Sequence, residues 1–226
     1  MRAFPPLLAT LFALLAWETS VLRTEEGGEP PAPPRAATSG PVAIPREAWN
    51  ASPVRPSARP MGTPRRITVH HSGSRSSRFA VSDVAREIRG IQHDHQDRAG
   101  WADIAYHFVI DHAGRLWEGR PLALQGAHAG DDASNRGNIG VCLLGDFDVE
   151  GPTAEQRQTL RDLVSRLESL YGIPPAEVYS HRGVRAAHGL GSTICPGRHL
   201  LAIVEDLRCD GPESPSAAGG GPVLGP

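Results

Sequence analysis

Two imidazoles and one thiol are the side chains of this sequence best suited to bind a zinc ion. His70 lies in the segment Val-His-His-Ser, His181 follows a short apolar stretch, and Cys195 lies in the turn-forming segment Ser-Thr-Ile-Cys-Pro-Gly. Two histidines and one cysteine suit Zn²⁺, and three protein ligands leave the fourth position of the ion open for water or substrate. The three residues are far apart in the sequence, so their spacing alone is weak evidence for a site.

His70, rather than its neighbour His71, is the predicted ligand. Polar and apolar residues alternate over 66–72, which predicts a half-exposed strand. Adjacent residues of a strand point to opposite faces, so only one of the two histidines can join a given site. His71 falls in register with the apolar residues of the segment and should point inward with them, whereas His70 falls in register with the polar residues.

Helices and strands alternate along the rest of the chain. The spacing of apolar residues predicts a helix over 82–97. A second helix is expected to begin at the capping-box pair Thr153 and Gln156 and to end at Gly172. The remaining predicted elements are a closing helix over 199–208 and strands over 106–110, 115–119, 138–144 and 178–181. This order predicts the α/β class, with a central mixed β-sheet flanked by helices.

The composition divides the 226 residues into one folded domain and its flanks. Residues 1–22 contain an apolar run that is short for a membrane span, so they are expected to be a signal peptide or an N-terminal anchor. Residues 23–41 are rich in Pro and Ala and are expected to be a linker, and residues 210–226 are expected to be a disordered tail. The folded domain is therefore predicted to span 42–209.

Charge and cysteine content narrow the possible partners. The formal net charge is -2, and no run of Lys or Arg offers the dense basic surface that a nucleic acid requires. We also expect a monomer without an obligate protein partner. An odd number of cysteines (Cys142, Cys195 and Cys209) cannot all pair within one molecule, so at least one is expected to be free, oxidised, paired outside the chain or bound to a metal. Cys142 lies in mid-strand, where a small buried hydrophobic side chain is expected.

Eight short motifs occur in an order that resembles a known family. They are Ile-Pro-Arg-Glu-Ala-Trp-Asn-Ala (44–51), Val-His-His-Ser (69–72), Gly-Trp-Ala-Asp-Ile-Ala-Tyr-His-Phe (100–108), Glu-Gly-Arg (118–120), Gly-Ala-His-Ala (126–129), Asn-Ile-Gly-Val (138–141), Ser-His-Arg (180–182) and Cys-Pro-Gly (195–197). In these segments the chain resembles the peptidoglycan-recognition-protein family and the related type-2 amidases. Eight motifs in order are far more specific than any one of them.

The resemblance implies a zinc hydrolase. It places the Zn²⁺ ligands at His70, His181 and Cys195, a catalytic tyrosine at Tyr106 and a polar helper at Thr193. Family members that only bind peptidoglycan typically lack the cysteine ligand, so this chain resembles the enzymatic branch. The implied reaction is hydrolysis of the amide between N-acetylmuramic acid and L-alanine. Without the resemblance, Tyr106 would be read as a core aromatic residue whose hydroxyl group is hydrogen-bonded.

The resemblance also implies which substrate is bound and where. In the family, a Gly-Trp pair (here Gly100 and Trp101) together with an arginine (here Arg120) goes with stem peptides that contain meso-diaminopimelate. The extra carboxylate of diaminopimelate can accept two parallel hydrogen bonds from a guanidinium group. His128 and His71 are the other expected substrate-binding residues. The expected partner is thus peptidoglycan or a muropeptide, and the expected location is periplasmic or secreted.

Other interpretations of the sequence remain. The domain could bind peptidoglycan without cleaving it, or it could be an amidase of small muropeptides or of another N-acyl amide. The interval between His181 and Cys195 is longer than in compact members of the family, and it contains His188, a rival ligand or a lid residue. Because Gly189 and Gly191 favour an irregular backbone, we expect residues 183–192 to form a surface loop.

Overall fold

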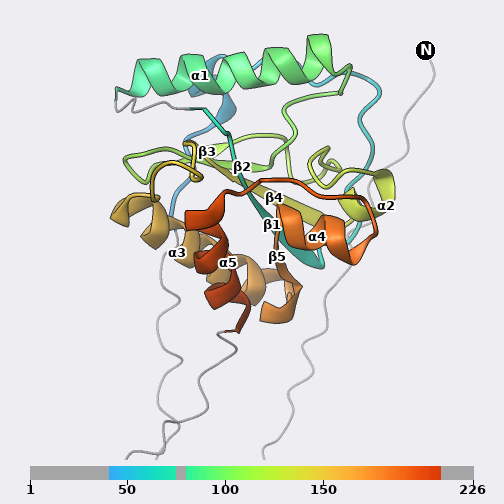
Figure 1. Cartoon of the computed structure of the whole chain (residues 1–226). Helices are drawn as coiled ribbons and strands as arrows, with labels where there is room; N and C mark the ends of the chain where they lie inside the picture. The colour runs from blue at the N-terminus through green and yellow to red at the C-terminus, as the bar shows by residue number, and fades with distance from the viewer. Residues whose placement is uncertain (1–40, 75–79, 210–226) are drawn as a thin grey trace, which may run out of the picture. The chain divides into compact units, whose positions relative to one another are not determined.

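Five strands form the central sheet, in the order β3-β2-β4-β1-β5 (Figure 1). The strands are β1 (Arg66–His71), β2 (Phe108–Ile110), β3 (Leu116–Glu118), β4 (Asn138–Leu143) and β5 (Val178–Ser180). The computed structural model describes residues 41–74 and 80–209. The predictions for residues 1–22, for 23–40 of the linker and for 210–226 lie outside this part of the chain.

The sheet is mixed, as predicted. Strand β1 pairs in parallel with both β4 and β5, and β2 pairs in parallel with β4, whereas β2 and β3 are antiparallel. The prediction of a half-exposed β1 was wrong, because this strand lies inside the sheet and all its residues after Arg66 are buried. Its polar face, which carries Thr68 and His70, therefore contacts other protein groups instead of solvent.

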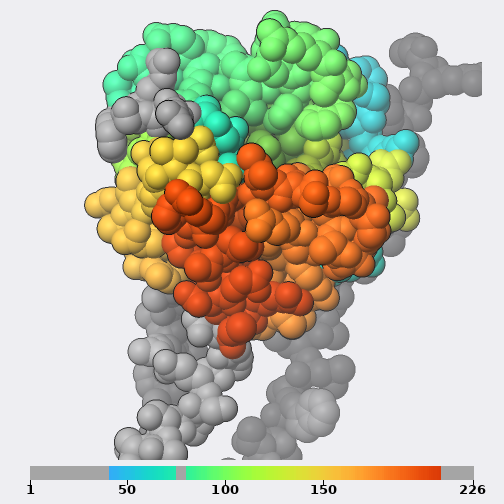
Figure 2. Space-filling view, viewed as in Figure 1, coloured from blue at the N-terminus to red at the C-terminus, as the bar shows by residue number. Residues whose placement is uncertain are grey.

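Helices cover both faces of the sheet (Figure 1). The α-helices are α1 (Val81–His93), α2 (Asp132–Asn135), α3 (Ala154–Tyr171), α4 (His181–Ala187) and α5 (Arg198–Cys209). Two 3₁₀ turns, η1 (Arg46–Trp49) and η3 (Pro175–Glu177), and one π-helical turn, η2 (Asp94–Arg98), complete the elements. The helix predicted over 82–97 is thus α1 extended by η2. Figure 2 shows α4 and α5 (orange to red) next to one another on the viewed face.

Two hydrophobic cores lie on opposite faces of the sheet. The larger core joins one face to α3 and α5 through Ile67, Val69, Ile139, Val141, Leu160, Leu163, Val164, Leu167, Leu200 and Val204. The smaller core joins the other face to α1 through Trp49, Val84, Ile88, Ile104, Val109, Trp117 and Leu144. Side chains alternate along a strand, and Ile67 and Val69 of β1 face the larger core. The residues next to them in β1, Thr68 and His70, therefore point to the other face of the sheet, where α1 lies.

Local signals in the sequence fix the ends of several elements as predicted. The capping box of α3 forms, since Thr153 accepts a hydrogen bond from the Gln156 amide while the Gln156 side chain bonds back to Thr153. Gly172 ends this helix in the left-handed conformation, with φ of 65°. Within the described ranges, no helix is both long and apolar enough to cross a membrane.

The surface loop predicted over 183–192 was wrong in its first half. Residues His181–Ala187 form α4, because the Ser180 hydroxyl group accepts a hydrogen bond from the Gly183 amide (3.0 Å) and so caps a helix. Only the residues that follow α4 are irregular. His188 ends the helix on the surface, where its Nε2 atom lies 3.0 Å from Nη1 of Arg66.

The capping box offers a test of the fold. Replacing Thr153 by Ala removes the bond to the Gln156 amide and a second bond from the hydroxyl group to the His112 carbonyl (3.0 Å). We expect Thr153→Ala to lower the free energy of unfolding by about 1–2 kcal/mol in a urea titration. Ser165→Ala, a change on the exposed face of the same helix, should alter it by less than about 0.5 kcal/mol. Equal effects of the two changes would contradict the assigned cap.

Candidate metal centre and active site

The fold brings the three predicted zinc ligands together. One ligand atom of each of His70, His181 and Cys195 lies within 4.8 Å of the other two. The sulfur of Cys195 is 3.7 Å from Nδ1 of His70, and the ring centroids of His70 and His181 are 4.5 Å apart. Among residues 41–74 and 80–209, this is the one cluster of at least three His, Cys, Asp or Glu side chains that could hold a metal ion.

Parallel strand pairing places the two histidines. His70 lies at the carboxyl end of β1, and β5 runs parallel to β1, with Val69 paired to Ser180. The carboxyl ends of parallel strands share one edge of the sheet, where ligands bind in open α/β folds. Because Ser180 caps α4, His181 becomes the first residue of that helix and stays next to the end of β1.

Arg182 holds the cysteine segment against the start of α4. Its backbone amide donates to the carbonyl group of Cys195 (3.1 Å), and its guanidinium group donates to the carbonyl groups of Thr193 (3.1 Å) and Ile194 (3.3 Å). The length of the interval between His181 and Cys195 therefore does not displace the ligand. His188, the predicted rival ligand, lies outside the cluster.

Burial sets the protonation of the ligands. It lowers the pKa of His70 well below its usual value, with further lowering from His181 and His128. Burial, then the charge of Arg185, lowers the pKa of His181 to about 4. Neutral imidazoles are the form that binds a metal. Burial raises the pKa of Cys195 to about 12, so without a cation this thiol keeps its proton, and a bound metal ion would displace it.

The residues present fit a zinc ion. The Nε2 atom of His181 is buried and has no hydrogen-bond partner within the described part of the chain. Such an atom is costly to leave unpaired, and a metal ion would satisfy it. Imidazole nitrogen and thiolate sulfur are the donors that zinc prefers.

Tyr106, the predicted catalytic tyrosine, lies beside the ligands. The centroid of its ring is 5.1 Å from that of His70. Burial, followed by the neighbouring thiols of Cys142 and Cys195, raises the pKa of Tyr106 well above its usual value, so its phenol stays protonated. The residue is fixed by the Arg120 amide, which donates to the Tyr106 carbonyl (2.7 Å). A Cβ atom at Gly119 would lie 2.3 Å from that carbonyl oxygen, which accounts for glycine in the Glu-Gly-Arg motif.

Thr193 lies two residues before the cysteine ligand and contacts it directly. Its hydroxyl oxygen accepts a hydrogen bond from the backbone amide of Cys195 (3.2 Å). A hydroxyl group that accepts in this way still carries one O–H donor. Thr193 therefore orients the Cys195 backbone and keeps a proton with which it can hydrogen-bond another group.

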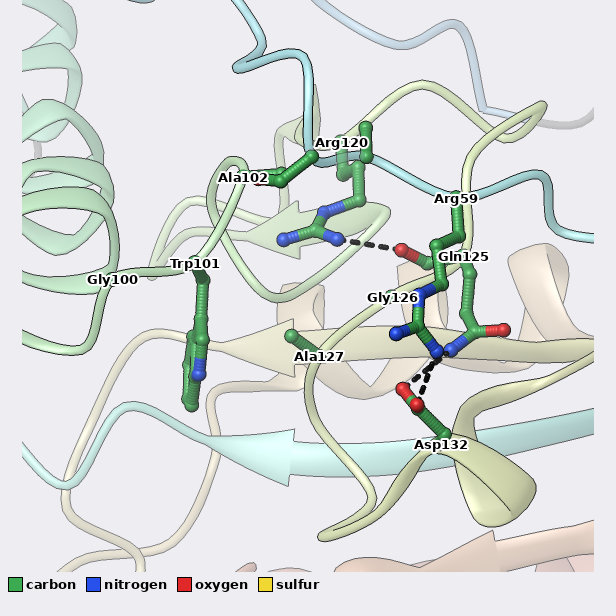
Figure 3. A pocket seen from close by; sticks show the side chains of 11 residues that line it. Arg59, Gly100, Trp101, Ala102, Arg120, Gln125, Gly126, Ala127 and Asp132 are labelled. Carbon is green, nitrogen blue, oxygen red and sulfur yellow. Dashed lines mark hydrogen bonds and ion pairs between the residues drawn. The ribbon is translucent and has the colours of Figure 1, made fainter.

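A pocket of about 220 Å³ contains the predicted substrate residues Gly100, Trp101 and Arg120 (Figure 3). Trp101 stands on one side of it, and the ion pair between Arg59 and Asp132 stands on the other. Three ring contacts connect the pocket to the metal ligands, since centroid distances are 4.8 Å from Trp101 to His95, 5.7 Å from His95 to Tyr106 and 5.1 Å from Tyr106 to His70.

The guanidinium group of Arg120 is buried and held in place. Its Nε, Nη1 and Nη2 atoms donate to the carbonyl groups of Ile104 (2.8 Å), Gln125 (2.6 Å) and Asp103 (2.8 Å). A guanidinium group has five N–H donors, so one on Nη1 and one on Nη2 remain. Because Arg120 lines the pocket, these two donors are the ones that a carboxylate group could bind there.

The other two predicted substrate residues lie elsewhere. His71 points to the face of β1 opposite His70, where its Nδ1 atom accepts a hydrogen bond from the Phe147 amide (3.3 Å). His128 is only 5% exposed, and its ring meets that of His70 edge-on, with 5.0 Å between centroids. Neither side chain lines the pocket.

Three residues near the site were missed by sequence reasoning. His95, in η2, carries the ring contacts between Trp101 and Tyr106. The available signal was its place in the apolar stripe of the predicted helix, which directs its ring inward. Arg59 precedes β1 and Asp132 begins α2, so these two pocket residues are far apart in the sequence and no local pattern indicates their pairing.

The sequence is similar to known peptidoglycan recognition proteins and amidases. The family model described as N-acetylmuramoyl-L-alanine amidase matches residues 60–198. Mouse peptidoglycan recognition protein 1 is 31% identical over 171 residues, which cover 75% of this chain and 89% of the mouse protein. N-acetylmuramoyl-L-alanine amidase of Sus scrofa is 32% identical over 170 residues, which cover 73% of this chain but 27% of the pig protein.

A solved structure shows the same fold. The crystal structure of peptidoglycan recognition protein-LE in complex with tracheal cytotoxin (monomeric diaminopimelic acid-type peptidoglycan) superposes with a TM-score of 0.63 at 29% identity. The match covers 73% of this chain and 92% of that one. The predicted resemblance and the predicted fold class are thus confirmed. The chain belongs to the family of peptidoglycan recognition proteins and type-2 N-acetylmuramoyl-L-alanine amidases.

Proposed function

We propose that this protein is a zinc-dependent N-acetylmuramoyl-L-alanine amidase that hydrolyses the amide between N-acetylmuramic acid and L-alanine in peptidoglycan. The observation that carries the proposal is the complete set of His70, His181 and Cys195 beside Tyr106. Three protein ligands suit a catalytic zinc site, whereas a structural site usually has a fourth. A module that only binds peptidoglycan has no need of this set.

The side chains around the cluster have distinct roles in the proposed reaction. Bound zinc would lower the pKa of a water molecule from about 16 toward 7 and polarise the amide carbonyl. Tyr106, which stays protonated, donates a hydrogen bond to the oxyanion that develops on the amide oxygen. Thr193, whose hydroxyl group accepts from the Cys195 amide and keeps one O–H donor, would supply a second hydrogen bond. His70 and His181 remain neutral throughout and provide only lone pairs.

The proposed substrate carries meso-diaminopimelate in its stem peptide. Its extra carboxylate would bind to the two remaining donors of Arg120, which the three carbonyl bonds hold in a fixed orientation. Trp101 would pack against the aliphatic part of the stem. The relative crystallised with diaminopimelic acid-type peptidoglycan supports this choice of substrate. Because this substrate lies outside the cytoplasm, we also propose that the protein is exported to the periplasm or secreted.

The direct test is digestion of purified diaminopimelate-type peptidoglycan, followed by mass analysis. We expect free stem peptides that begin with L-alanine. Binding to the wall without any cleavage would instead identify a recognition module, and cleavage of soluble muropeptides alone would identify an amidase of wall fragments. Glycan fragments with new reducing ends would reject the amidase altogether.

Removal of the thiol ligand should abolish both metal and activity. We expect purified protein to bind about one zinc ion and Cys195→Ala to lose most of that zinc, with activity reduced at least about 100-fold, since catalysis needs the ion. Cys209→Ala is the matched control, because this exposed cysteine lies at the end of α5 and outside the cluster. Full activity of metal-free Cys195→Ala protein would reject the mechanism.

Zinc affinity should depend on pH through a single proton. The pKa of Cys195 is raised to about 12, so its proton must leave when zinc binds, whereas the lowered pKa values of His70 and His181 mean that neither carries a proton to lose. The zinc association constant should therefore fall about tenfold for each unit that the pH is lowered from 8 to 6. Chelator competition measures this slope, and a slope of two or more would show that a histidine is protonated as well.

Tyr106→Phe separates catalysis from metal binding. It removes the proposed donor to the oxyanion and keeps the ring, so we expect kcat to fall about 10²- to 10³-fold while zinc affinity changes less than about threefold. Tyr179→Phe is the control and should leave kcat unchanged, because Tyr179 lies in the edge strand β5, where its ring contacts Arg66 and Arg208. Loss of zinc from the Tyr106→Phe protein would mean that the hydroxyl group supports the ligands instead.

Arg120→Lys tests the carboxylate contact. A lysine keeps the charge but not the paired donors, so we expect kcat/KM on diaminopimelate-type stems to fall about 10- to 100-fold, and on lysine-type stems less than about threefold. Arg55→Lys, which changes an arginine bound to the Gln96 carbonyl and Asp97 outside the pocket, controls for the loss of a guanidinium group. Equal losses on both substrates would reject the contact, and thermal unfolding of each variant reports any loss of stability.

A further inference from the structure

A chain of hydrogen bonds leads from a zinc ligand into the sheet. Nε2 of His70 lies 3.1 Å from Nδ1 of His128, and Nε2 of His128 lies 3.1 Å from the carbonyl oxygen of Asn138. All three groups are buried. The other ring nitrogen of His70, Nδ1, is the one that lies 3.7 Å from the sulfur of Cys195.

The Asn138 carbonyl at the end of this hydrogen-bond series determines which ring nitrogen of each histidine carries the proton. A carbonyl oxygen only accepts, so Nε2 of His128 must donate to Asn138. A neutral imidazole ring has one N–H group, so a ring that donates from Nε2 accepts at Nδ1, and Nδ1 of His128 is the acceptor toward His70. Nε2 of His70 then donates to it, and the neutral ring of His70 is left with its lone pair on Nδ1. That lone pair faces Cys195, inside the ligand cluster.

The backbone is shaped to hold the ring of His128. A Cβ atom at Gly126 or at Gly140 would lie 2.5 Å from Cδ2 of His128, so both positions admit only glycine beside this ring. The side chain of Asn135 accepts a hydrogen bond from the His128 amide (2.8 Å), which fixes the backbone of His128. Contacts of this kind on two sides fix the ring to a single orientation.

These contacts indicate a role for His128 other than the predicted contact with substrate. We infer that His128 is a positioning residue that holds His70 in the tautomer whose Nδ1 lone pair is directed at the metal ion. The identity of the ion as zinc rests on the proposed function, whereas the tautomer rests on the hydrogen bonds alone. Partners that orient a ligand in this way typically raise metal affinity by about 10- to 100-fold.

The tautomer can be read directly from the full chain after zinc has been removed with a chelator. Two-bond nitrogen–proton NMR correlations distinguish the two forms of a neutral histidine. We expect His70 and His128 both to carry their proton on Nε2. A proton on Nδ1 of His70 would overturn the inference, whatever the enzyme hydrolyses.

Two substitutions at His128 test the effect on the metal. His128→Leu removes the acceptor for His70, and we expect the Kd for zinc to rise about 10- to 100-fold. His128→Asn places an amide oxygen near the position of Nδ1, so it can still accept from His70, and we expect it to recover most of the affinity. Chelator competition gives each Kd without any assay of activity.

His107→Leu is the matched control for the loss of a buried ring. His107 also bonds to two backbone groups, the carbonyl of Leu124 (3.0 Å) and the amide of Gly140 (2.9 Å), but it does not bond to His70. We expect this change to lower stability as His128→Leu does while zinc Kd shifts less than about threefold. Equal affinities of wild-type protein and folded His128→Leu would overturn the inference. Wild-type protein that binds no zinc would overturn the proposed function instead, and the tautomer measurement would still decide the role of His128.

Discussion

The parallel pairing of β1 between β4 and β5 is the constraint on which the site depends. It brings the end of β1, with His70, to the same edge of the sheet as the first residue of α4, with His181. It also buries both faces of β1, so the polar face must find its partners inside the protein. A slip of one residue in this register would exchange His70 for His71 and turn Thr68 and His70 toward the larger hydrophobic core.

Three of the imidazole rings around the metal ligands are tied to backbone groups. His107 bonds to the Leu124 carbonyl, His128 to the Asn138 carbonyl, and His95 accepts from the Ala105 amide. An unpaired polar group in this position would cost about 1–3 kcal/mol. These bonds therefore keep the rings that surround the ligand cluster in fixed orientations before any ligand binds.

Sequence reasoning found the parts of the site that depend on local pattern. Strand parity selected His70 over His71, and the capping box located α3 to within a residue. It missed α4, because the signal is a single serine cap at the end of a very short strand. It also took β1 for a half-exposed strand, and it could not foresee that Arg120 is buried. Both depend on which distant segments pack together, and no local spacing records that.

The raised pKa of Cys195 has a consequence for how the chain matures. Only a thiolate attacks a disulfide, and at pH 7 a thiol with a pKa of about 12 is ionised in about one molecule in 10⁵. The folded chain without metal is therefore a poor partner in thiol–disulfide exchange, although all three of its cysteines are free. Folding therefore makes this ligand slow to react as a thiol before an ion binds.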